Sequence, residues 1–476
     1  MATLYIFITV LILGTASFFV IRKLPEKKRS LYIKIFAIIY FLVCFAKVFF
    51  ADGFIWVING GFYGDTLYEK TDILQSLLRW GMYFSCLITT TAACTKPRVF
   101  KNISVYFCLP VMLVAMFFFK DFMTYYMDGL GRGIHAEYWI RAMILGAEFV
   151  LGILIPVLIT LNGHYFNVKS GKEWALFCGI LPLLFLTTFP VYIPQSLFGY
   201  TQIVMKPFSI VNILWIVITI SIILILIKVF RNKDYDTRYA VCLWLALDLF
   251  IHYNQLYLMG FSISRLPFQL CNLGAYFFIL VMVFKWKRLY EFSFVANIVG
   301  TIIAMSVPDM SSHGLAYFWN IHFIFEHGLV LILPSVIMGL NIFSRLTKKS
   351  LLYIFVGFTI YFMFCSIAGS LLNIYGYSNN YFYIFDPMKI TDIVPFLSFT
   401  TKTFFTVNGY TLYPIYQLMI FLLYSGLMLL FYLLVRWIYT ITDDNIEIEK
   451  RGKVLTKKVF KKIFKKKKKE VKNAEN

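Results

Sequence analysis

The sequence predicts an all-α integral membrane protein, a polytopic bundle in which about thirteen helices cross the bilayer. Hydrophobic residues make up 60% of its 476 residues and charged residues only 14%, with a mean hydropathy of +0.74. This composition excludes an ordinary soluble domain, in which about 25% of residues are charged. Long apolar runs recur along the whole chain, and lysine and arginine collect in alternate connections between these runs.

Each predicted span is an apolar run long enough to cross a hydrocarbon core of about 30 Å at a helical rise of about 1.5 Å per residue. The first seven runs cover residues 2–21, 31–51, 73–93, 103–119, 139–161, 174–193 and 210–229. The remaining runs cover residues 239–258, 266–284, 292–307, 317–343, 351–374 and 416–437. No positive region precedes the first run, so we expect a retained helix there rather than a signal peptide.

The charges of the connections predict the orientation of the bundle, because short loops rich in lysine and arginine stay in the cytoplasm. Basic clusters follow the odd-numbered spans, at residues 22–29, 96–101, 231–238, 285–288 and 345–349. The loops after even-numbered spans carry aspartates and few basic residues. We therefore expect a multi-pass protein of the cell membrane with its N-terminus outside and its C-terminal tail in the cytoplasm.

The C-terminal tail, residues 441–476, holds much of the net charge of +21. Leu455, Val459 and Ile463 recur every four residues among its lysines. This pattern favours a basic amphipathic helix bound to anionic lipids of the inner leaflet, and a solvated tail is the alternative. Nucleic-acid binding is not expected, because the tail has no aromatic platform for stacking bases.

Two stretches of the chain resemble each other weakly, which suggests a duplicated helical unit. The segment Arg79–Cys86 parallels Arg265–Cys271, and Ile153–Pro156 parallels Leu331–Pro334. Without gaps, this alignment places Glu148 opposite Glu326 and Phe149 opposite His327. The first copy therefore lacks the histidine of the second.

The repeat predicts four regions. Residues 1–30 form an extra helix and loop, residues 31–232 a degenerate bundle of about six helices, residues 233–440 a second parallel bundle of about six helices, and residues 441–476 the basic tail. Because the histidine occurs only in the second copy, we expect the functional site there. The first copy is then structural or guides the substrate.

The candidate site lies near the predicted outer face of the second copy, where polar residues gather despite their cost in lipid. From the predicted helix starts, Cys271 lies roughly 8 Å and His327 roughly 15 Å below the surface. Candidate substrate-binding residues are Arg265, Gln269, Asn272, Asp309, His322, Glu326, Asp248 and His252. The eight cysteines lie in apolar spans without disulfide or metal-ligand spacing, so neither a metal nor a cofactor is expected.

The segments Arg265-Leu-Pro-Phe-Gln-Leu-Cys-Asn272, Pro308-Asp309, Phe325-Glu-His327 and Asn380-Tyr381 with Pro387 resemble the YwaF/TMEM164-type integral membrane family. The resemblance covers residues 239–437, and family members are about half as long as this chain. One relative is an acyltransferase that moves fatty acyl chains onto lysophospholipids through a cysteine. The resemblance implies Cys271 as the nucleophile and His327 as its base.

The family motif has a histidine two residues before the cysteine, where this chain has Gln269. His322 and His252 therefore remain alternatives to His327 as the base. If the resemblance holds, Cys271 takes an acyl group from a phospholipid and passes it to a lysophospholipid or a lipoprotein. Arg265 would then bind a phosphate.

Asp309 or Glu326 would orient a histidine, and Asn272 or Gln269 would donate hydrogen bonds to the oxyanion. Each of these residues also has a purely structural reading, since membrane cysteines are mostly inert packing residues. A transporter or lipid permease built from two parallel repeats is the main alternative function, and a membrane scaffold that recruits partners through its tail is a third.

Overall fold

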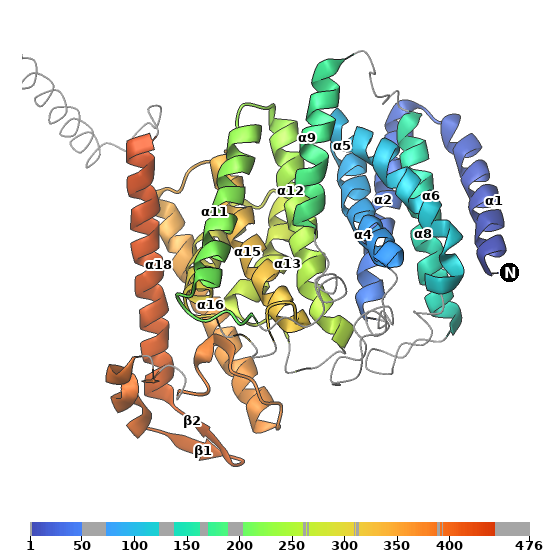
Figure 1. Ribbon diagram of the computed structural model, residues 1–476. Coiled ribbons are helices and arrows are strands. Elements are labelled where there is room, and N and C mark those ends of the chain that lie inside the picture. The colour runs from blue at the N-terminus through green and yellow to red at the C-terminus, as the bar shows by residue number, and fades with distance from the viewer. Residues whose placement is uncertain are drawn as a thin grey trace, which may run out of the picture.

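The computed structural model describes residues 2–49, 73–122, 138–161, 170–188, 203–259, 266–308, 314–387 and 394–442, together with residues 263, 310, 391 and 392. Within these ranges each predicted span coincides with a helix (Figure 1). Long apolar stretches fold as helices in lipid because every backbone hydrogen bond is then satisfied within the segment.

The first part of the chain forms helices that follow the predicted spans closely. They are α1 (Ala2–Arg22), α2 (Glu26–Phe49), α4 (Ile73–Cys94), α5 (Arg98–Ile103), α6 (Leu109–Phe117), α8 (Tyr138–Thr160), α9 (Gly171–Thr187) and α11 (Ile210–Phe230). A π-helical turn, η1 (Ser104–Cys108), joins α5 and α6 into one continuous helix. Pro110 follows this turn, and its missing amide hydrogen and bulky ring explain why the helix widens there.

The second part of the chain has the same character, with short 3₁₀ turns between its helices. Its helices are α12 (Tyr235–Asn254), α13 (Leu270–Phe284), α14 (Lys287–Ser306), α15 (Phe318–Gly339), α16 (Lys348–Ile374) and α18 (Pro414–Thr442), and its 3₁₀ turns are η2 (Gln255–Met259), η4 (Tyr381–Tyr383) and η5 (Pro395–Lys402). Helix α14 begins before the predicted residue 292, because buried Glu291 accepts a hydrogen bond from Ser350 (2.9 Å) and pairs with Lys287. Hydropathy alone excludes such a charged first turn.

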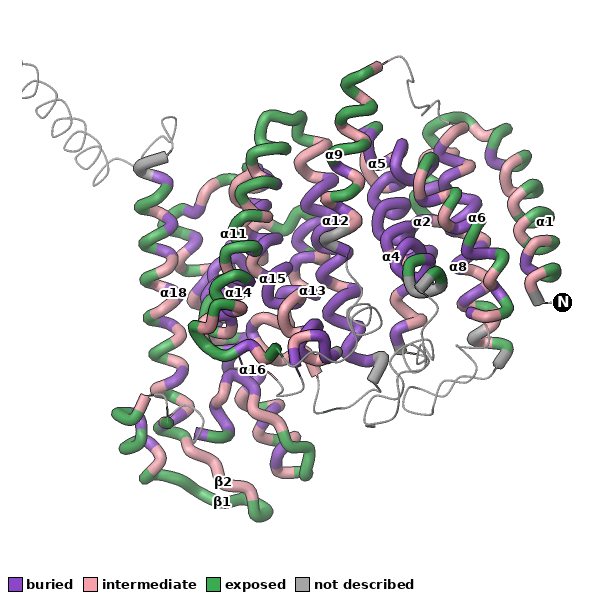
Figure 2. Tube along the Cα trace, viewed as in Figure 1, coloured by how far each residue is buried: buried purple, intermediate pink, exposed green. Residues whose placement is uncertain are grey.

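The helices form two groups that meet along α4 and α12 (Figure 1). These two helices are largely buried, whereas the outer helices expose one side (Figure 2). Tyr83 on α4 donates a hydrogen bond from its hydroxyl to the Asp248 carboxylate on α12, at 2.9 Å. Nearby, the Phe45 and Phe250 rings lie 4.8 Å apart. The junction thus combines aromatic packing with a buried polar contact.

Corresponding helices of the two predicted copies have corresponding neighbours. Helix α2 packs against α4 and α8, and α12 packs against α13 and α15. Helix α11 departs from this pattern, because it packs against α15 of the second group. Asn212 on α11 also donates to the backbone carbonyl of Met305 on α14 (2.8 Å), a second contact with this group. The duplication and its boundary at residue 232 remain predictions.

The outer surface of the bundle is apolar. Leu11 on α1 is 69% exposed, Ile210 on α11 76% and Leu430 on α18 64%. In water such a surface would aggregate, whereas lipid solvates it. Nine helices of the described chain are long and apolar enough to cross a membrane, and α13 is a shorter apolar helix. A multi-pass membrane protein follows, while the count of thirteen spans stays a prediction.

A small β-hairpin interrupts the otherwise all-α fold, between η5 and α18. Strands β1 (Phe405–Val407) and β2 (Tyr410–Leu412) pair antiparallel around Asn408 and Gly409, which both have positive φ. Asn-Gly favours this tight turn because both residues tolerate left-handed backbone angles. The prediction of a purely helical chain missed this element.

The basic connections lie at one end of the bundle. Figure 1 shows the α1–α2 and α11–α12 connections at the same end as the last turn of α18, and the hairpin at the other end. This arrangement agrees with alternating spans and with the tail on the basic side. The tail itself, residues 443–476, lies outside the described residues, and its cytoplasmic location stays a prediction.

Candidate functional site

Cys271 lies in the first turn of α13, two residues after Gln269, which occupies the N-cap position without capping the helix through its side chain. The Cys271 side chain is partly exposed, and its thiol donates to the Asn272 amide oxygen at 3.2 Å. The start of a helix carries unsatisfied backbone N–H groups and the positive end of the helix dipole. An oxyanion formed beside this position would accept hydrogen bonds from these N–H groups.

Gln269 fixes the loop that covers the start of α13. Its amide nitrogen donates to the carbonyl of Asn380 (3.1 Å), and its amide oxygen accepts from the backbone N–H of Phe382 (2.9 Å). Phe382 and Tyr383 have φ values of 55° and 58°, which side-chain-bearing residues rarely adopt. The described contacts of Gln269 therefore serve the loop, and its predicted oxyanion role stays a prediction.

Three buried side chains form a cluster between α12 and α15. His322 and Glu326 lie one turn apart on α15, with Nδ1 of His322 3.6 Å from Oε2 of Glu326. The second ring nitrogen of His322 lies 2.9 Å from the carbonyl of Tyr253. The His252 ring from α12 stacks on His322 at 5.5 Å between centroids. We name His252, His322 and Glu326 the histidine cluster.

Cys271 lies on α13, which packs against α15, the helix that carries His322 and Glu326. Further along α13, the Tyr276 ring lies 5.8 Å from the ring of Tyr253, whose backbone carbonyl contacts His322. Glu326 also has one buried carboxyl oxygen without a hydrogen-bond partner among the described residues. The fold thus brings the predicted nucleophile, an acid and two histidines from three helices into one buried region.

His327 lies on a different face of α15 from His322. Its Nδ1 lies 2.8 Å from the carbonyl of Phe323, and its ring lies 4.1 Å from the Phe323 ring. Phe323 in turn contacts Trp215 of α11 at 6.1 Å. These contacts belong to the α11 side of the helix, so the pairing of His327 with Cys271 remains a prediction.

The other predicted site residues are distributed around this region. Asp248 lies one turn before His252 on α12 and accepts the hydrogen bond of Tyr83 from the first group of helices. Asn272 accepts from Cys271. Arg265 and Asp309 lie outside the described residues. No cluster of His, Cys, Asp and Glu suited to a metal ion occurs in the part of the chain that the structure describes.

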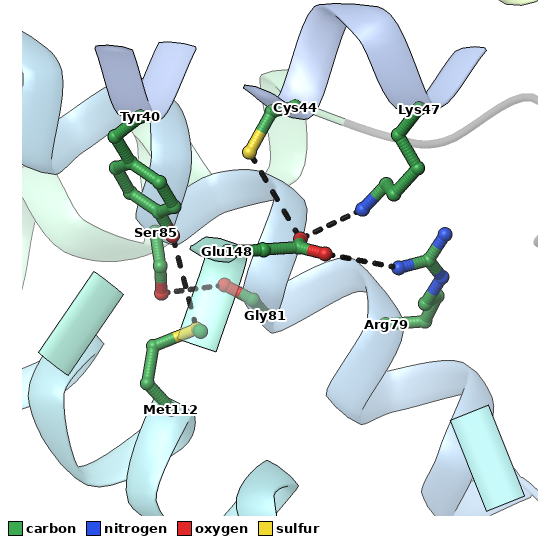
Figure 3. A network of polar contacts seen from close by, with 8 residues as sticks. All are labelled: Tyr40, Cys44, Lys47, Arg79, Gly81, Ser85, Met112 and Glu148. Carbon is green, nitrogen blue, oxygen red and sulfur yellow. Dashed lines mark hydrogen bonds and ion pairs between the residues drawn. The ribbon is translucent and has the colours of Figure 1, made fainter. Parts of the chain in front are cut away.

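A second buried charged group, not predicted as a site, lies in the first group of helices (Figure 3). Glu148 on α8 is fully buried, and its carboxylate lies 2.7 Å from Nζ of Lys47 and 4.0 Å from Nη1 of Arg79. The Cys44 thiol lies 3.9 Å from the same carboxylate. The available signal was the occurrence of single charges in three apolar runs, which in lipid seek partners.

Comparisons with known proteins place the site within a recognised family region. No curated protein and no solved structure matches the chain. The matched region begins before α11 and ends within α18, so it contains Cys271 and the histidine cluster and omits most of the first group of helices. Residues 204–435 match the model of the TMEM164 family, which confirms the predicted family for the C-terminal half of the chain.

Proposed function

We propose that the C-terminal half is a membrane acyltransferase in which Cys271 carries the acyl group. The observation that supports this most is the position of Cys271 at the start of α13, a helix that packs against α15, which carries His322 and Glu326. The Tyr253 carbonyl orients the His322 ring through Nε2, and Glu326 lies beside Nδ1. A nucleophile, a base and a group that orients the base are the parts needed for covalent acyl transfer.

The proposed reaction begins with proton transfer from the Cys271 thiol to a histidine. The sulfur attacks the ester carbonyl of a phospholipid, and the tetrahedral intermediate forms beside the N–H groups that open α13. Its collapse breaks the ester C–O bond, and the departing lysophospholipid oxygen takes the proton back from the imidazolium. A hydroxyl or amine of the acceptor then attacks the thioester and restores the thiol.

His322 is our first choice for the base. Its Nε2 faces the carbonyl of Tyr253 and so carries the proton of the neutral ring, which makes Nδ1 the acceptor. Glu326 beside Nδ1 would stabilise the imidazolium that forms. His252 and His327 are the alternatives, and His327 is the base that the family resemblance implies.

The proposed donor is a phospholipid, and the acceptor is a lysophospholipid, a glycolipid or a lipoprotein amine. The apolar surface of the bundle supports lipid substrates, because an acyl chain can approach the site through the membrane. Nothing in the described residues selects one acceptor.

The decisive experiment measures the acyl-enzyme. Detergent-solubilised protein is incubated with phospholipid, and its intact mass is recorded before and after hydroxylamine, which cleaves thioesters. We expect a hydroxylamine-labile acyl adduct on the wild type and on Cys365→Ala, which removes a second cysteine of the same region, a buried one. Cys271→Ala should carry none, and an adduct on that variant would refute Cys271 as the nucleophile.

The same assay identifies the base. Loss of a general base slows proton transfer by about 10²–10⁴-fold. We expect His322→Ala to slow adduct formation by this amount and His327→Ala to have a much smaller effect. The reverse order would restore the base implied by the family resemblance.

A lipid or solute permease is the second candidate function, and one observation favours it. Glu148 and Glu326, opposite each other in the proposed repeat, both lie buried beside basic groups. Paired intramembrane charges in both halves are typical of transporters. Reconstituted transport that survives Cys271→Ala, with no acyl adduct on the wild type, would favour this function.

A further inference from the structure

A cavity opens between the two groups of helices at the basic end of the bundle. Its volume is about 460 Å³, and it is lined by residues of α2, α4, α5, α8 and α12 and by Lys285, which directly follows α13. The charged and aromatic residues that line it are Lys34, Lys96, Lys101, Lys285, Tyr235 and Tyr239, together with Asp236. This cavity is separate from Cys271, which lies at the opposite end of α13. We name it the lysine cavity.

Positive charge dominates the lysine cavity. Asp236 is the one carboxylate among its lining residues, and it pairs with Lys96 at 3.1 Å. That pair is exposed, with 83% of the lysine and 45% of the aspartate side chain accessible, so its net attraction is weak. The Glu26 carboxylate, at the start of α2, also attracts the Lys101 ammonium electrostatically. The four lysines that line the cavity thus outnumber the acidic residues that face it.

Lys285 is held toward the cavity by an unusual backbone. It ends α13 with φ 50° and ψ 41°, a left-handed conformation uncommon for residues with a side chain. Its ammonium lies 5.0 Å from the Tyr239 ring centroid and 5.6 Å from that of Tyr235. Aromatic faces hold a cation in place without neutralising it. The lysine therefore stays available to a further anion.

We infer that the lysine cavity is a binding site for a phosphate group. Ammonium groups bind phosphate oxygens through charge-assisted hydrogen bonds, and a partly enclosed wall strengthens this attraction. The phosphate belongs either to an anionic phospholipid of the adjoining leaflet or to a soluble phosphate compound. Lys34, Lys96 and Lys101 come from the N-terminal half, and Lys285 comes from the family-matched half. The site is therefore complete only when both halves are present.

Lysine footprinting of the full chain in nanodiscs tests this inference. In the first arm, protein in phosphatidylcholine discs is acetylated with and without inorganic pyrophosphate. In the second arm, protein in discs that contain phosphatidylglycerol is acetylated without pyrophosphate and compared with protein in phosphatidylcholine discs. We expect protection of Lys34, Lys101 and Lys285. Exposed Lys349, at the start of α16, is the control for general charge effects. Protection by pyrophosphate identifies a soluble ligand, and protection only by phosphatidylglycerol identifies a lipid headgroup.

Two variants sharpen the test. Lys101→Gln should raise about tenfold the pyrophosphate concentration that half-protects Lys34 and Lys285 from acetylation. This is the factor expected for one lost charge-assisted hydrogen bond. Lys349→Gln should leave it unchanged. The inference is overturned if no cavity lysine is protected in either arm, or if Lys349 is protected as strongly as they are. Acyl transfer is not measured here, so this result stands apart from that of the proposed function.

Discussion

Gln269 illustrates how one side chain organises the candidate site. It occupies the position where the family motif has histidine, and it uses both ends of its amide to hold the backbone of residues 380–382. The Tyr361 hydroxyl also donates to the backbone carbonyl of Gln269, at 3.3 Å. The loop over the start of α13 thus depends on a residue two positions before Cys271.

Replacing Gln269 by Ala should loosen this loop. The change removes two hydrogen bonds, and we expect the free energy of unfolding to fall by about 1–3 kcal/mol. Alkylation of Cys271 by a maleimide should become faster. Gln417→Ala is the matched control, because the Gln417 amide nitrogen has no hydrogen-bond partner among the described residues. Unchanged stability and alkylation in Gln269→Ala would show that the loop is held by other contacts.

Asp234 gives a prediction about pH. It caps α12 outside the membrane, where its carboxylate accepts from the hydroxyl (2.7 Å) and the backbone N–H (3.0 Å) of Thr237. The hydrogen bond from Thr237 holds the pKa of Asp234 below its usual value. A lowered pKa means that this stabilisation is present above about pH 4, the pKa of the unfolded chain, and is lost as the pH falls through the lower folded value.

Asp234→Ala should therefore lower stability by about 1 kcal/mol at pH 7 and by less at pH 3, as thermal unfolding in detergent would measure. Asp234→Asn is the control, since asparagine can cap the helix at both pH values without titrating. An equal loss for Asp234→Ala at both pH values would contradict the assigned role of the carboxylate.

At the scale of elements, hydropathy predicts well where the helices lie in the chain. It predicts poorly which face of each helix points toward its neighbours. The helices followed from composition because each apolar run must satisfy its own hydrogen bonds in lipid. Which side of α15 faces α12 depends on packing between distant segments. His322 and His327 are equally polar in the sequence, yet only His322 contacts Tyr253 of α12. The packing of α13, which carries Cys271, against α15, which carries Glu326, likewise does not follow from sequence spacing.

Hydropathy does not reveal the hairpin before α18, because the hairpin lies between two apolar runs. The sequence Phe405-Thr-Val-Asn-Gly-Tyr-Thr-Leu412 alternates around Asn-Gly, which is a strong local signal for a two-residue turn. The sequence therefore carries a local signal for the hairpin, whereas it carries no local signal for which residues of distant helices meet.

Gly409 should tolerate substitution poorly. Its φ of 77° lies in the left-handed region, and Gly409→Ala should destabilise the hairpin by about 1 kcal/mol. Because the hairpin lies at the surface, we expect faster proteolysis at residues 405–412 and little change in the unfolding of the bundle. Gly426→Ala, in α18 with open space around it and no positive φ, is the control. Equal protease resistance of both variants would argue against a tight turn at Gly409.

At the scale of the whole molecule, the two halves handle buried charge in different ways. Glu148 is paired with Lys47 and faces Arg79, two strongly basic residues. Glu326 is paired with His322, which can be neutral. The same position in the proposed repeat thus carries an acid between two basic side chains in the first half and an acid beside a histidine in the second. This difference is consistent with a structural first half and a chemical second half.

The two glutamates should therefore respond differently to neutralisation. Glu148→Gln leaves Lys47 and Arg79 repelling each other in a buried site, so we expect a loss of about 3–5 kcal/mol in the free energy of unfolding. Glu326→Gln should cost much less, because His322 can lose its charge. Adding Lys47→Met to Glu148→Gln should recover part of the loss by removing one of the two cations. Unfolding by sodium dodecyl sulfate in mixed micelles measures all three variants, and similar losses for the two glutamates would mean that the halves share one structural role.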